Sequence, residues 1–337
     1  MKAIVCKKPG ELTLTDVPKP NSVAGEVLVK IECIGICGTD LHIFSGRQPF
    51  VEYPRIMGHE LSATVISSPG GCDLRPGTPV IINPYIACGK CVACRKNKPN
   101  CCSAINVLGV HQNGGMCEYL SVPETALIHA GTLSINQAAM VEFLAIGAHA
   151  CSRGKTGPGD RVLVVGLGPI GLGVALFARL AGAEVTVMDN NTARVTKAQD
   201  IFDFKNAVIA SNEVSAELSQ LTNGDFFDLV FDATGNAKAI EVGFQFVAHG
   251  GTTVLVSIVK DNITFSDTEF HKREMCIVGS RNATLEDFKH VIQNIENGNI
   301  PTDKFFTHSC KLEDVPQMLP VWAEDPDNVI KAIVKVT

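Results

Sequence analysis

Trp and Tyr are scarce in this chain of 337 residues, and it has neither a long apolar run nor an excess of positive charge. It contains one Trp and three Tyr, and its formal net charge is −6. A mildly acidic chain with so few Trp and Tyr residues is a poor candidate for binding nucleic acid or an anionic membrane surface. No run reaches about 18 uninterrupted apolar residues, so we expect no membrane-spanning helix.

The sequence also shows no pattern typical of a secretory leader or of a disulfide framework. The N-terminal stretch MKAIVCKKPGELTL has no long apolar segment, so we expect no signal peptide. An odd number of cysteines, thirteen, is more typical of metal ligands and buried thiols in a reducing compartment. With 45% hydrophobic and 19% charged residues, the composition predicts about two globular domains. We therefore expect a cytoplasmic enzyme.

The pattern of the chain changes near Gly154. Before it, short apolar segments lie between turn residues, which predicts an irregular β-rich domain with strands at 26–31, 61–67 and 79–82. After it, nearly continuous Val, Ile and Leu segments alternate with helical stretches, which predicts a doubly wound parallel sheet in an α/β domain. The strands expected there are 161–165, 184–189, 207–210, 229–232, 252–257 and 276–279.

The C-terminal part returns to other structure. A capping-box pattern begins at Thr284, and Gly298 lies at the expected end of the helix that follows it. A last strand is expected at 332–336. We find neither an internal repeat nor a low-complexity tract.

A glycine-rich loop follows the strand at 161–165 and opens a helix. It consists of Gly166, Leu167, Gly168, Pro169, Ile170 and Gly171. In this context the glycines permit a tight turn, a close approach of a pyrophosphate and close helix packing. Asp189 ends the next strand, where its carboxylate would bind an adenosine ribose and repel a 2′-phosphate, which favours NAD over NADP. Arg194 lies either over the adenine or in solvent.

Four cysteines with short spacing predict a structural zinc site. They are Cys88, Cys91, Cys94 and Cys102. Four thiolates close a tetrahedral shell around zinc and leave no open position. Cys101 is an alternative to Cys102, and an iron–sulfur cluster is the poorer alternative metal group. Free thiols on an exposed lobe are the remaining interpretation.

A second set of metal-binding residue types is more dispersed. Cys37, His59 and Glu60 lie in the first domain, and Glu142 lies at its junction with the second. Taken singly, each has an ordinary interpretation as a buried thiol, a core histidine or a surface acid. Only their combination with the rest of the chain indicates chemistry.

Over essentially its whole length the chain resembles the zinc-dependent medium-chain dehydrogenase/reductase family. The resemblance lies in the runs Cys37-Gly38-Thr39-Asp40 and Gly58-His59-Glu60, the four-cysteine lobe, Val122-Pro123, the glycine-rich loop and Asp232-Ala233-Thr234-Gly235. It implies a GroES-like catalytic domain formed by residues 1–143 and 282–337. It also implies a Rossmann NAD-binding domain at 144–281, with Thr234 at the cofactor, and a homodimer or homotetramer.

Within that family the chain looks like the polyol and sugar-acid branch, which includes sorbitol and threonine dehydrogenases. This likeness implies a catalytic zinc held by Cys37, His59 and Glu142, with Glu60 beside the metal and able to exchange as a ligand. The branch usually has Pro after the acid at 142, where this chain has Phe143.

Four loop segments give a closer resemblance to a group of L-galactonate 5-dehydrogenases and starvation-sensing dehydrogenases. They are 46–55, 108–115, 265–274 and 279–288. The likeness implies a hexonate substrate, such as L-galactonate or L-gulonate, oxidised at C5. A guanidinium suits the bidentate binding of its carboxylate. Candidate substrate residues are Arg281 first, Lys272 and Arg47 less so, and Asn282, His111 and Asn113 along the pocket.

Proton transfer requires a path out of a closed site. Thr39 and His42 are three residues apart, which can place both on one side of a short helix. We expect a relay from the Thr39 hydroxyl through the nicotinamide ribose to His42, although Thr39 can also cap the helix and His42 can simply face solvent.

Two other functions stay open at this point. The same scaffold serves polyol, threonine and simple alcohol dehydrogenases, which a substrate panel would separate. A nucleotide-binding regulatory protein could also keep the fold, because fold alone does not determine function. The intact set Cys37, His59 and Glu142 disfavours that second alternative, since a binding module needs no open metal position.

Overall fold

The computed structural model describes residues 1–21, 25–69, 73–325 and 327–336, and the chain forms two compact units. Unit 1 comprises residues 1–142 and 284–337, and unit 2 comprises residues 143–283. These limits differ by one or two residues from the domain boundaries expected from the sequence. Each unit has a hydrophobic core of its own.

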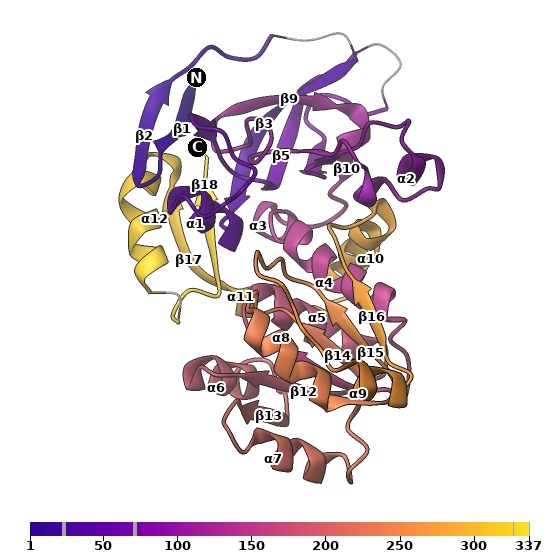
Figure 1. Ribbon diagram of the computed structural model, residues 1–337. Helices are drawn as coiled ribbons and strands as arrows, with labels where there is room; N and C mark the ends of the chain where they lie inside the picture. The colour runs from indigo at the N-terminus through magenta and orange to yellow at the C-terminus, as the bar shows by residue number, and fades with distance from the viewer. Residues whose placement is uncertain (22–24, 70–72, 326, 337) are drawn as a thin grey trace. The chain divides into compact units, whose positions relative to one another are not determined.

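Unit 1 is rich in β-structure (Figure 1). Its strands are β1 (Lys2–Lys8), β2 (Glu11–Asp16), β3 (Glu26–Gly35), β4 (Arg55–Ile56), β5 (Glu60–Ser67), β6 (Pro79–Ile82), β7 (Tyr85–Ile86), β8 (Asn106–Val107), β9 (Tyr119–Pro123), β10 (Leu127–His129), β17 (Phe306–Lys311) and β18 (Lys331–Lys335). The main sheet has the order β10-β6-β5-β3-β18-β17, with β9 also paired to β3. Smaller sheets are formed by β2-β1-β4 and by β7-β8.

The helices of unit 1 are short. They are α1 (Gly38–Phe44), α2 (Val92–Arg95), α3 (Ile135–Ala138), α10 (Leu285–Glu296), α11 (Thr302–Phe305) and α12 (Val315–Glu324). The expected helix after Thr284 is confirmed as α10, and its capping box is formed by Thr284 and Asp287. Helix α4 (Val141–Gly154) begins in unit 1 and continues into unit 2.

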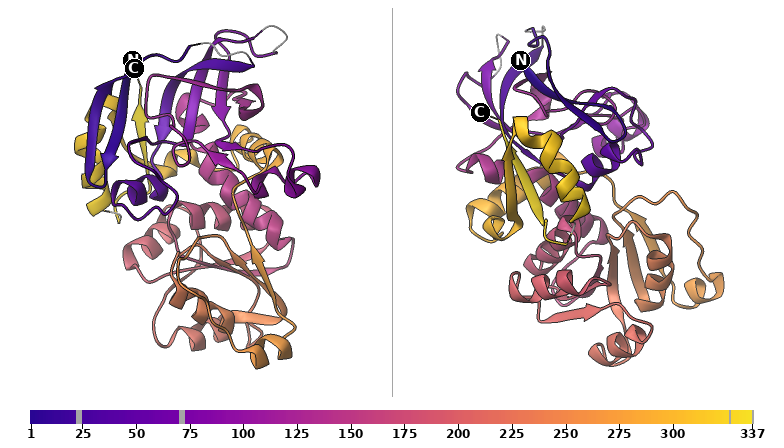
Figure 2. Two further views of the ribbon diagram at one scale, coloured as in Figure 1. Left: turned by 45° about the horizontal axis from the view of Figure 1, so that its top comes forward. Right: turned by 90° about the vertical axis from the view of Figure 1, so that its left-hand side faces the viewer.

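The two ends of the chain meet in the main sheet of unit 1. Strand β18 is antiparallel to β3 and parallel to β17, and Ile333 of β18 pairs with Gly35 of β3. Figure 2 shows the yellow C-terminal strands beside the indigo N-terminal part of the same unit. Strand β3 therefore separates β5, which follows His59, from β18 at the other end of the chain.

Unit 2 is a six-stranded parallel sheet with helices between its strands. The strands are β11 (Arg161–Val165), β12 (Glu184–Asp189), β13 (Asn206–Ile209), β14 (Phe227–Asp232), β15 (Val247–Leu255) and β16 (Cys276–Gly279). The helices are α5 (Pro169–Leu180), α6 (Thr192–Asp200), α7 (Val214–Leu221), α8 (Ala237–Gly243) and α9 (Asp267–Lys272). Val162 to Val165 are buried, because helices cover both faces of a parallel sheet.

The strand order β13-β12-β11-β14-β15-β16 reverses direction on either side of β11. This reversal creates a switch point between β11 and β14, where open parallel sheets bind their ligands. The doubly wound sheet predicted from the sequence is thus confirmed. Among the described residues, no helix is both long enough and apolar enough to cross a bilayer.

Candidate active site and metal centres

The four-cysteine lobe brings its thiols together around helix α2. Each of Cys88, Cys91, Cys94 and Cys102 offers a sulfur, and these four sulfurs lie within 4.8 Å of one another. Cys101, the alternative fourth ligand, is exposed and stands outside this group. Backbone N–H groups, first that of Cys94, lower the pKa of the Cys91 thiol to about 5. Four such thiols suit the closed tetrahedral coordination of structural zinc.

A second cluster forms where α1 and β5 begin. Cys37 is the N-cap of α1, while His59 and Glu60 stand at the start of β5. Their ligand atoms also lie within 4.8 Å of one another. Gly58 precedes the pair with φ +91°, and a Cβ there would crowd Met116. The turn that aims His59 into the cluster therefore favours glycine.

Asp40 supports this cluster from beneath. It is fully buried, and its carboxylate accepts hydrogen bonds from the backbone N–H of Cys37 at 3.0 Å and of Gly58 at 3.2 Å. Its Oδ1 lies 3.9 Å from Nδ1 of His59. One carboxylate thus fixes the backbone on both sides of the cluster and lies beside the outer nitrogen of the histidine, as carboxylates do behind metal-bound imidazoles.

The electrostatics of the cluster favour a cation. Burial lowers the pKa of His59, but the negative charges of Asp40, Cys37 and Glu142 outweigh it and raise that pKa well above the usual range. A thiol, an imidazole and carboxylates form the mixed donor set of catalytic zinc sites. The residues present therefore fit a zinc ion.

Glu142 lies beside these three residues but is not one of the group within 4.8 Å. It stands in the first turn of α4, is buried, and accepts a hydrogen bond from the Tyr85 hydroxyl. Burial, and then the charge of Glu60, raises its pKa to about 7 against the opposing effect of His59. Phe143 continues α4 and is fully buried, so the helix accommodates this residue without a break.

Sequence reasoning missed a buried lysine at this site. Nζ of Lys331 on β18 lies 2.8 Å from both carboxylate oxygens of Glu60 and 3.2 Å from the carbonyl oxygen of Ile36. Only 1% of Lys331 is exposed. Its signal in the sequence was a lysine inside the apolar stretch from Ile330 to Val334.

The proposed proton-relay residues share a helix. Thr39 and His42 both belong to α1, where Thr39 is half-buried and His42 is exposed. An exposed imidazole can exchange protons with solvent, which suits His42 to the outer end of the expected relay. The part of Thr39 in that relay stays a prediction.

The glycine-rich loop connects β11 to α5. Gly166 has φ +93°, and a Cβ there would lie 2.9 Å from the carbonyl carbon of Ala233, while a Cβ at Gly171 would overlap the Gly166 carbonyl oxygen. Gly168 caps α5, with Pro169 and Ile170 in the first turn, and a Cβ there would meet no protein atom within 4 Å. The structure therefore needs glycine at 166 and 171 for packing, whereas Gly168 leaves open space at a helix N-terminus, where phosphates bind.

Asp189 faces this loop at the end of β12. Its carboxylate accepts hydrogen bonds from the backbone N–H of Leu167 at 2.7 Å and of Asn191 at 2.9 Å. Nη1 of the half-buried Arg194 lies 3.8 Å from it. Asp189 thus shapes the loop itself, a role that sequence reasoning did not include.

Thr234 lies across the switch point from the loop, because Ala233 donates its backbone N–H to the Val165 carbonyl. The Thr234 hydroxyl donates a hydrogen bond to Asp232 at 2.9 Å. This hydroxyl therefore orders the turn after β14, and the exposed Thr234 side chain also stands at the ligand-binding edge of the sheet.

The candidate substrate residues are divided between the two units. Arg281 is exposed and follows β16 in unit 2, next to Asn282 with φ +54°. In unit 1, His111 stacks on Phe50 and accepts a hydrogen bond from the Val107 N–H, while Asn113 accepts one from the Ile56 N–H. His111 therefore holds its own loop, and Asn113 joins that loop to β4.

The two weaker candidates for the carboxylate have partners nearby. Lys272 is exposed and lies 3.8 Å from Glu269, one turn earlier on α9. Arg47 is exposed and donates a hydrogen bond to the Ser45 hydroxyl at 2.9 Å. These local partners are typical of surface charges.

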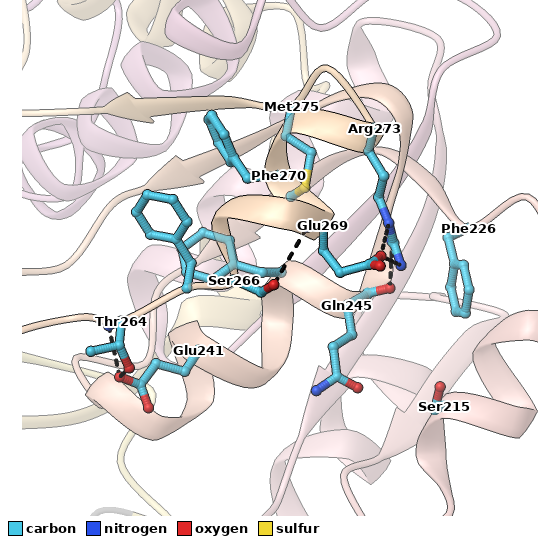
Figure 3. Close-up of a pocket in the computed structure, with 12 residues that line it drawn as sticks. Ser215, Phe226, Glu241, Gln245, Thr264, Ser266, Glu269, Phe270, Arg273 and Met275 are labelled. Carbon is cyan, nitrogen blue, oxygen red and sulfur yellow. Dashed lines mark hydrogen bonds and ion pairs between the residues drawn. The ribbon is translucent and has the colours of Figure 1, made fainter.

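Unit 2 also contains a cavity of about 640 Å³ that none of the predicted site residues lines (Figure 3). Its polar side chains pair with one another: Glu269 with Arg273, and Glu241 with Thr264. Phe226, Phe270 and other apolar side chains form the rest of its wall. Because neither metal-binding cluster nor the glycine-rich loop lines this cavity, it is not part of the candidate site described above.

Comparisons with known proteins agree on one family. Residues 23–132 match the alcohol dehydrogenase GroES-like domain, and residues 169–297 match the zinc-binding dehydrogenase domain. L-galactonate-5-dehydrogenase of Escherichia coli K12 is 41% identical over 91% of each chain. L-threonine 3-dehydrogenase of Pyrococcus horikoshii is 32% identical over 92% of each chain.

A solved structure gives the same picture at the level of the fold. The structure of the alcohol dehydrogenase rspB from Escherichia coli CFT073, complexed with NADH, superimposes with a TM-score of 0.93. The two sequences are 29% identical, and the match covers 99% of each chain.

The two metal clusters predict different consequences of losing a ligand. The purified protein should contain about two zinc ions per chain. Cys37→Ala should lose about one of them and still fold, whereas Cys91→Ala should lose one and unfold at a clearly lower temperature, because metal binding stabilises a lobe with little core of its own. Metal analysis and thermal unfolding check this. An unchanged zinc content in Cys37→Ala would contradict the second metal site.

Substitutions in the glycine-rich loop are predicted to affect either the unfolding temperature or NADH binding, depending on the position. Gly168→Ala should leave the unfolding temperature unchanged but weaken NADH binding at least about tenfold, because its methyl group occupies the space for the pyrophosphate. Gly171→Ala should lower the unfolding temperature itself, since its methyl group overlaps a backbone oxygen. Fluorescence titration with NADH and calorimetry distinguish the two. Unweakened binding by Gly168→Ala would place the dinucleotide elsewhere.

Proposed function

The chain belongs to the zinc-dependent alcohol dehydrogenase family, and from this premise we propose that it oxidises a secondary hydroxyl group of a sugar acid to a ketone with NAD as the acceptor. The observation that carries the proposal is the cluster of the half-buried Cys37 with the buried His59 and Glu60, and with Glu142 beside it. A thiol, an imidazole and a carboxylate in such a cluster can hold a metal and leave one position for a substrate oxygen.

Cys37 and His59 would hold the zinc, with Glu142 or Glu60 as the third ligand. When bound, zinc supplies a Lewis acid that lowers the pKa of a hydroxyl group, and NAD supplies the hydride acceptor. Asp40 keeps the backbone on both sides of Cys37 and His59 in place, and the Tyr85 hydroxyl fixes the carboxylate of Glu142. These contacts position the ligands before the substrate arrives.

Two residues of α1 would carry the released proton. The Thr39 hydroxyl would hold the proton near the metal cluster, and the exposed imidazole of His42 would release it to water. When bound, NAD would supply the ribose hydroxyl groups of such a relay. An imidazole titrates near neutral pH and is therefore suited to the last position of such a relay.

The cofactor would bind at the switch point of the parallel sheet. Gly168 and the N-terminus of α5 would receive the pyrophosphate, and Asp189 would stand beside the adenosine ribose, with Thr234 on the opposite side of the crevice. Arg194 lies beside Asp189 and would border the adenosine portion. The negative charge of Asp189 disfavours a 2′-phosphate, which supports NAD over NADP.

The substrate class rests on likeness over nearly the whole chain. A relative named L-galactonate-5-dehydrogenase shares 41% of its residues with this chain, which supports a hexonate such as L-galactonate or L-gulonate, oxidised at C5. In this proposal Arg281, at the carboxyl end of β16, binds the substrate carboxylate, with Asn282 beside it. The charge-assisted fork of a guanidinium matches a carboxylate.

The same site would also serve L-threonine or a polyol, and the relative named L-threonine 3-dehydrogenase keeps that alternative in view. An NAD-reduction assay over hexonates, polyols and L-threonine tests the proposal. Turnover of hexonates supports it, whereas turnover of L-threonine or neutral polyols alone overturns the substrate class. NADH binding without turnover of any alcohol would instead indicate a regulatory protein.

Cofactor choice is predicted to depend on the charge at position 189. The unmodified protein should prefer NAD, and Asp189→Ser should narrow the gap in kcat/KM between NAD and NADP, because the repulsion of the 2′-phosphate is removed. Asn190→Ser, at the exposed neighbouring position, is the matched control and should leave the preference unchanged. Equal use of both cofactors by the unmodified protein would refute this assignment.

Selectivity for a negatively charged substrate is predicted to depend on Arg281. Loss of a charge-assisted bidentate contact costs about 2–4 kcal/mol, so Arg281→Ala should lower kcat/KM for L-galactonate or L-gulonate roughly 30- to 1000-fold. Activity on a neutral polyol should change far less. Lys272→Ala, which also removes an exposed cation of unit 2, serves as the control. Equal losses on both substrate types would show that the carboxylate is bound elsewhere.

A further inference from the structure

The metal cluster contains one carboxylate more than an open site requires. A catalytic zinc keeps three protein ligands and an open fourth position, whereas four protein ligands close the shell. Here Cys37, His59 and Glu60 already offer ligand atoms within 4.8 Å, and Glu142 is close enough for its pKa to respond to both His59 and Glu60. If all four bound, no position would be left for a substrate oxygen.

Lys331 holds one of these carboxylates. Its Nζ lies 2.8 Å from Oε1 and 2.8 Å from Oε2 of Glu60, so both oxygens face the ammonium group. Both residues are almost completely buried, and a third contact to the Ile36 carbonyl fixes the ammonium. A charge-assisted pair of this kind is strong because water does not compete for either partner.

The sheet is built to let this pair form. Glu60 on β5 pairs with Gly35 on β3, and Gly35 lies opposite Ile333 on β18. A Cβ at Gly35 would overlap Oε2 of Glu60, so the missing side chain leaves the carboxylate free to reach across β3 toward Lys331. The contact therefore joins two strands that are not neighbours, over a gap that only glycine leaves open.

We propose that Lys331 competes with the metal for Glu60 and thereby keeps one coordination position open for the substrate. Lys331 is then a positioning residue, which acts through Glu60 and does not touch the substrate. Cys37, His59 and Glu142 are the three ligands that remain, and the Tyr85 hydroxyl holds Glu142 in place. This inference deepens the proposed dehydrogenase function and rests on it.

Removal of the ammonium group should close the metal site instead of emptying it. In Lys331→Met both oxygens of Glu60 become available to the metal. The variant should keep about two zinc ions per chain and release its more labile zinc to a chelator at least about tenfold more slowly than the unmodified protein. Activity on the best substrate of the panel should fall at least about 100-fold.

Imidazole reports on the open position without reference to the substrate. In the Co²⁺-loaded protein, imidazole should bind at the open coordination position and shift the visible absorption bands. The closed four-cysteine site cannot accept a further ligand, so the shift reports on the open site alone. The bands of Co²⁺-loaded Lys331→Met should not respond. Lys331→Arg should respond, since a guanidinium can still pair with both oxygens, and Lys335→Met, at the exposed end of the same strand, is the matched control.

The double variant Lys331→Met/Glu60→Gln decides between competition and a merely structural role. A neutral amide is a poor zinc ligand, so the imidazole response should return and zinc should leave at least about tenfold faster than from Lys331→Met. If the single variant does not fold, the double variant, which buries no unpaired charge, should bind imidazole and release zinc no more slowly than the unmodified protein.

Three results would overturn the inference: loss of the labile zinc from Lys331→Met, a preserved imidazole response in that variant, or loss of the labile zinc from the double variant. The first and third would identify Glu60 as an obligatory ligand that Lys331 supports. None of these readouts depends on the substrate. If no hexonate in the substrate panel were turned over, the proposed function would be overturned. The metal measurements would still test the role of Lys331.

Discussion

Lys331 and Glu60 form an ion pair that is almost completely removed from water, and the architecture of unit 1 depends on it. Burying a charge without a partner costs free energy, so the strands that carry these two residues must lie close enough for the charges to pair. Glu60 belongs to β5 near the start of the chain, and Lys331 belongs to β18 near its end. The pair therefore draws the C-terminal strand into the N-terminal sheet, directly beneath the metal cluster.

Around this pair, other buried polar and charged groups hold the residues of the site in place. Asp40 fixes the backbone next to Cys37 and His59, Tyr85 binds Glu142, and Lys331 binds Glu60. The two carboxylates of the site thus each have a second group that holds them, while Asp40 fixes the backbone next to the other two donors. Such support is what distinguishes a catalytic metal site from an accidental collection of donors. By contrast, backbone N–H groups in the four-cysteine lobe lower the pKa of Cys88 and Cys91 and so favour their thiolates.

Local patterns predicted most of unit 2 and the four-cysteine cluster, whereas Cys37, His59 and Glu142 were expected only from the resemblance to a family. Strand β11, the glycine-rich loop and the start of α5 follow from a buried apolar run and three glycines, each with a nearby steric or spatial reason. Strands β1, β2 and β17 were not predicted, because these segments are only partly buried and therefore lack a strong apolar pattern. The ends of β15 were also misplaced by a few residues, because local propensity defines an element better than its limits.

The residues behind the site could not be predicted from the sequence. Lys331 looks like an interruption of an apolar strand until the register places Glu60 across Gly35 from it. The sequence indicated Asp40 only as part of a motif, and no pattern in it indicated a role for Tyr85. Zinc-edge X-ray absorption on the purified enzyme tests the account most directly: the protein ligands should give roughly five sulfurs to two nitrogen or oxygen atoms, summed over one closed and one open site, and a water molecule in the open position would add one oxygen. A spectrum fitted by sulfur ligands alone would contradict it.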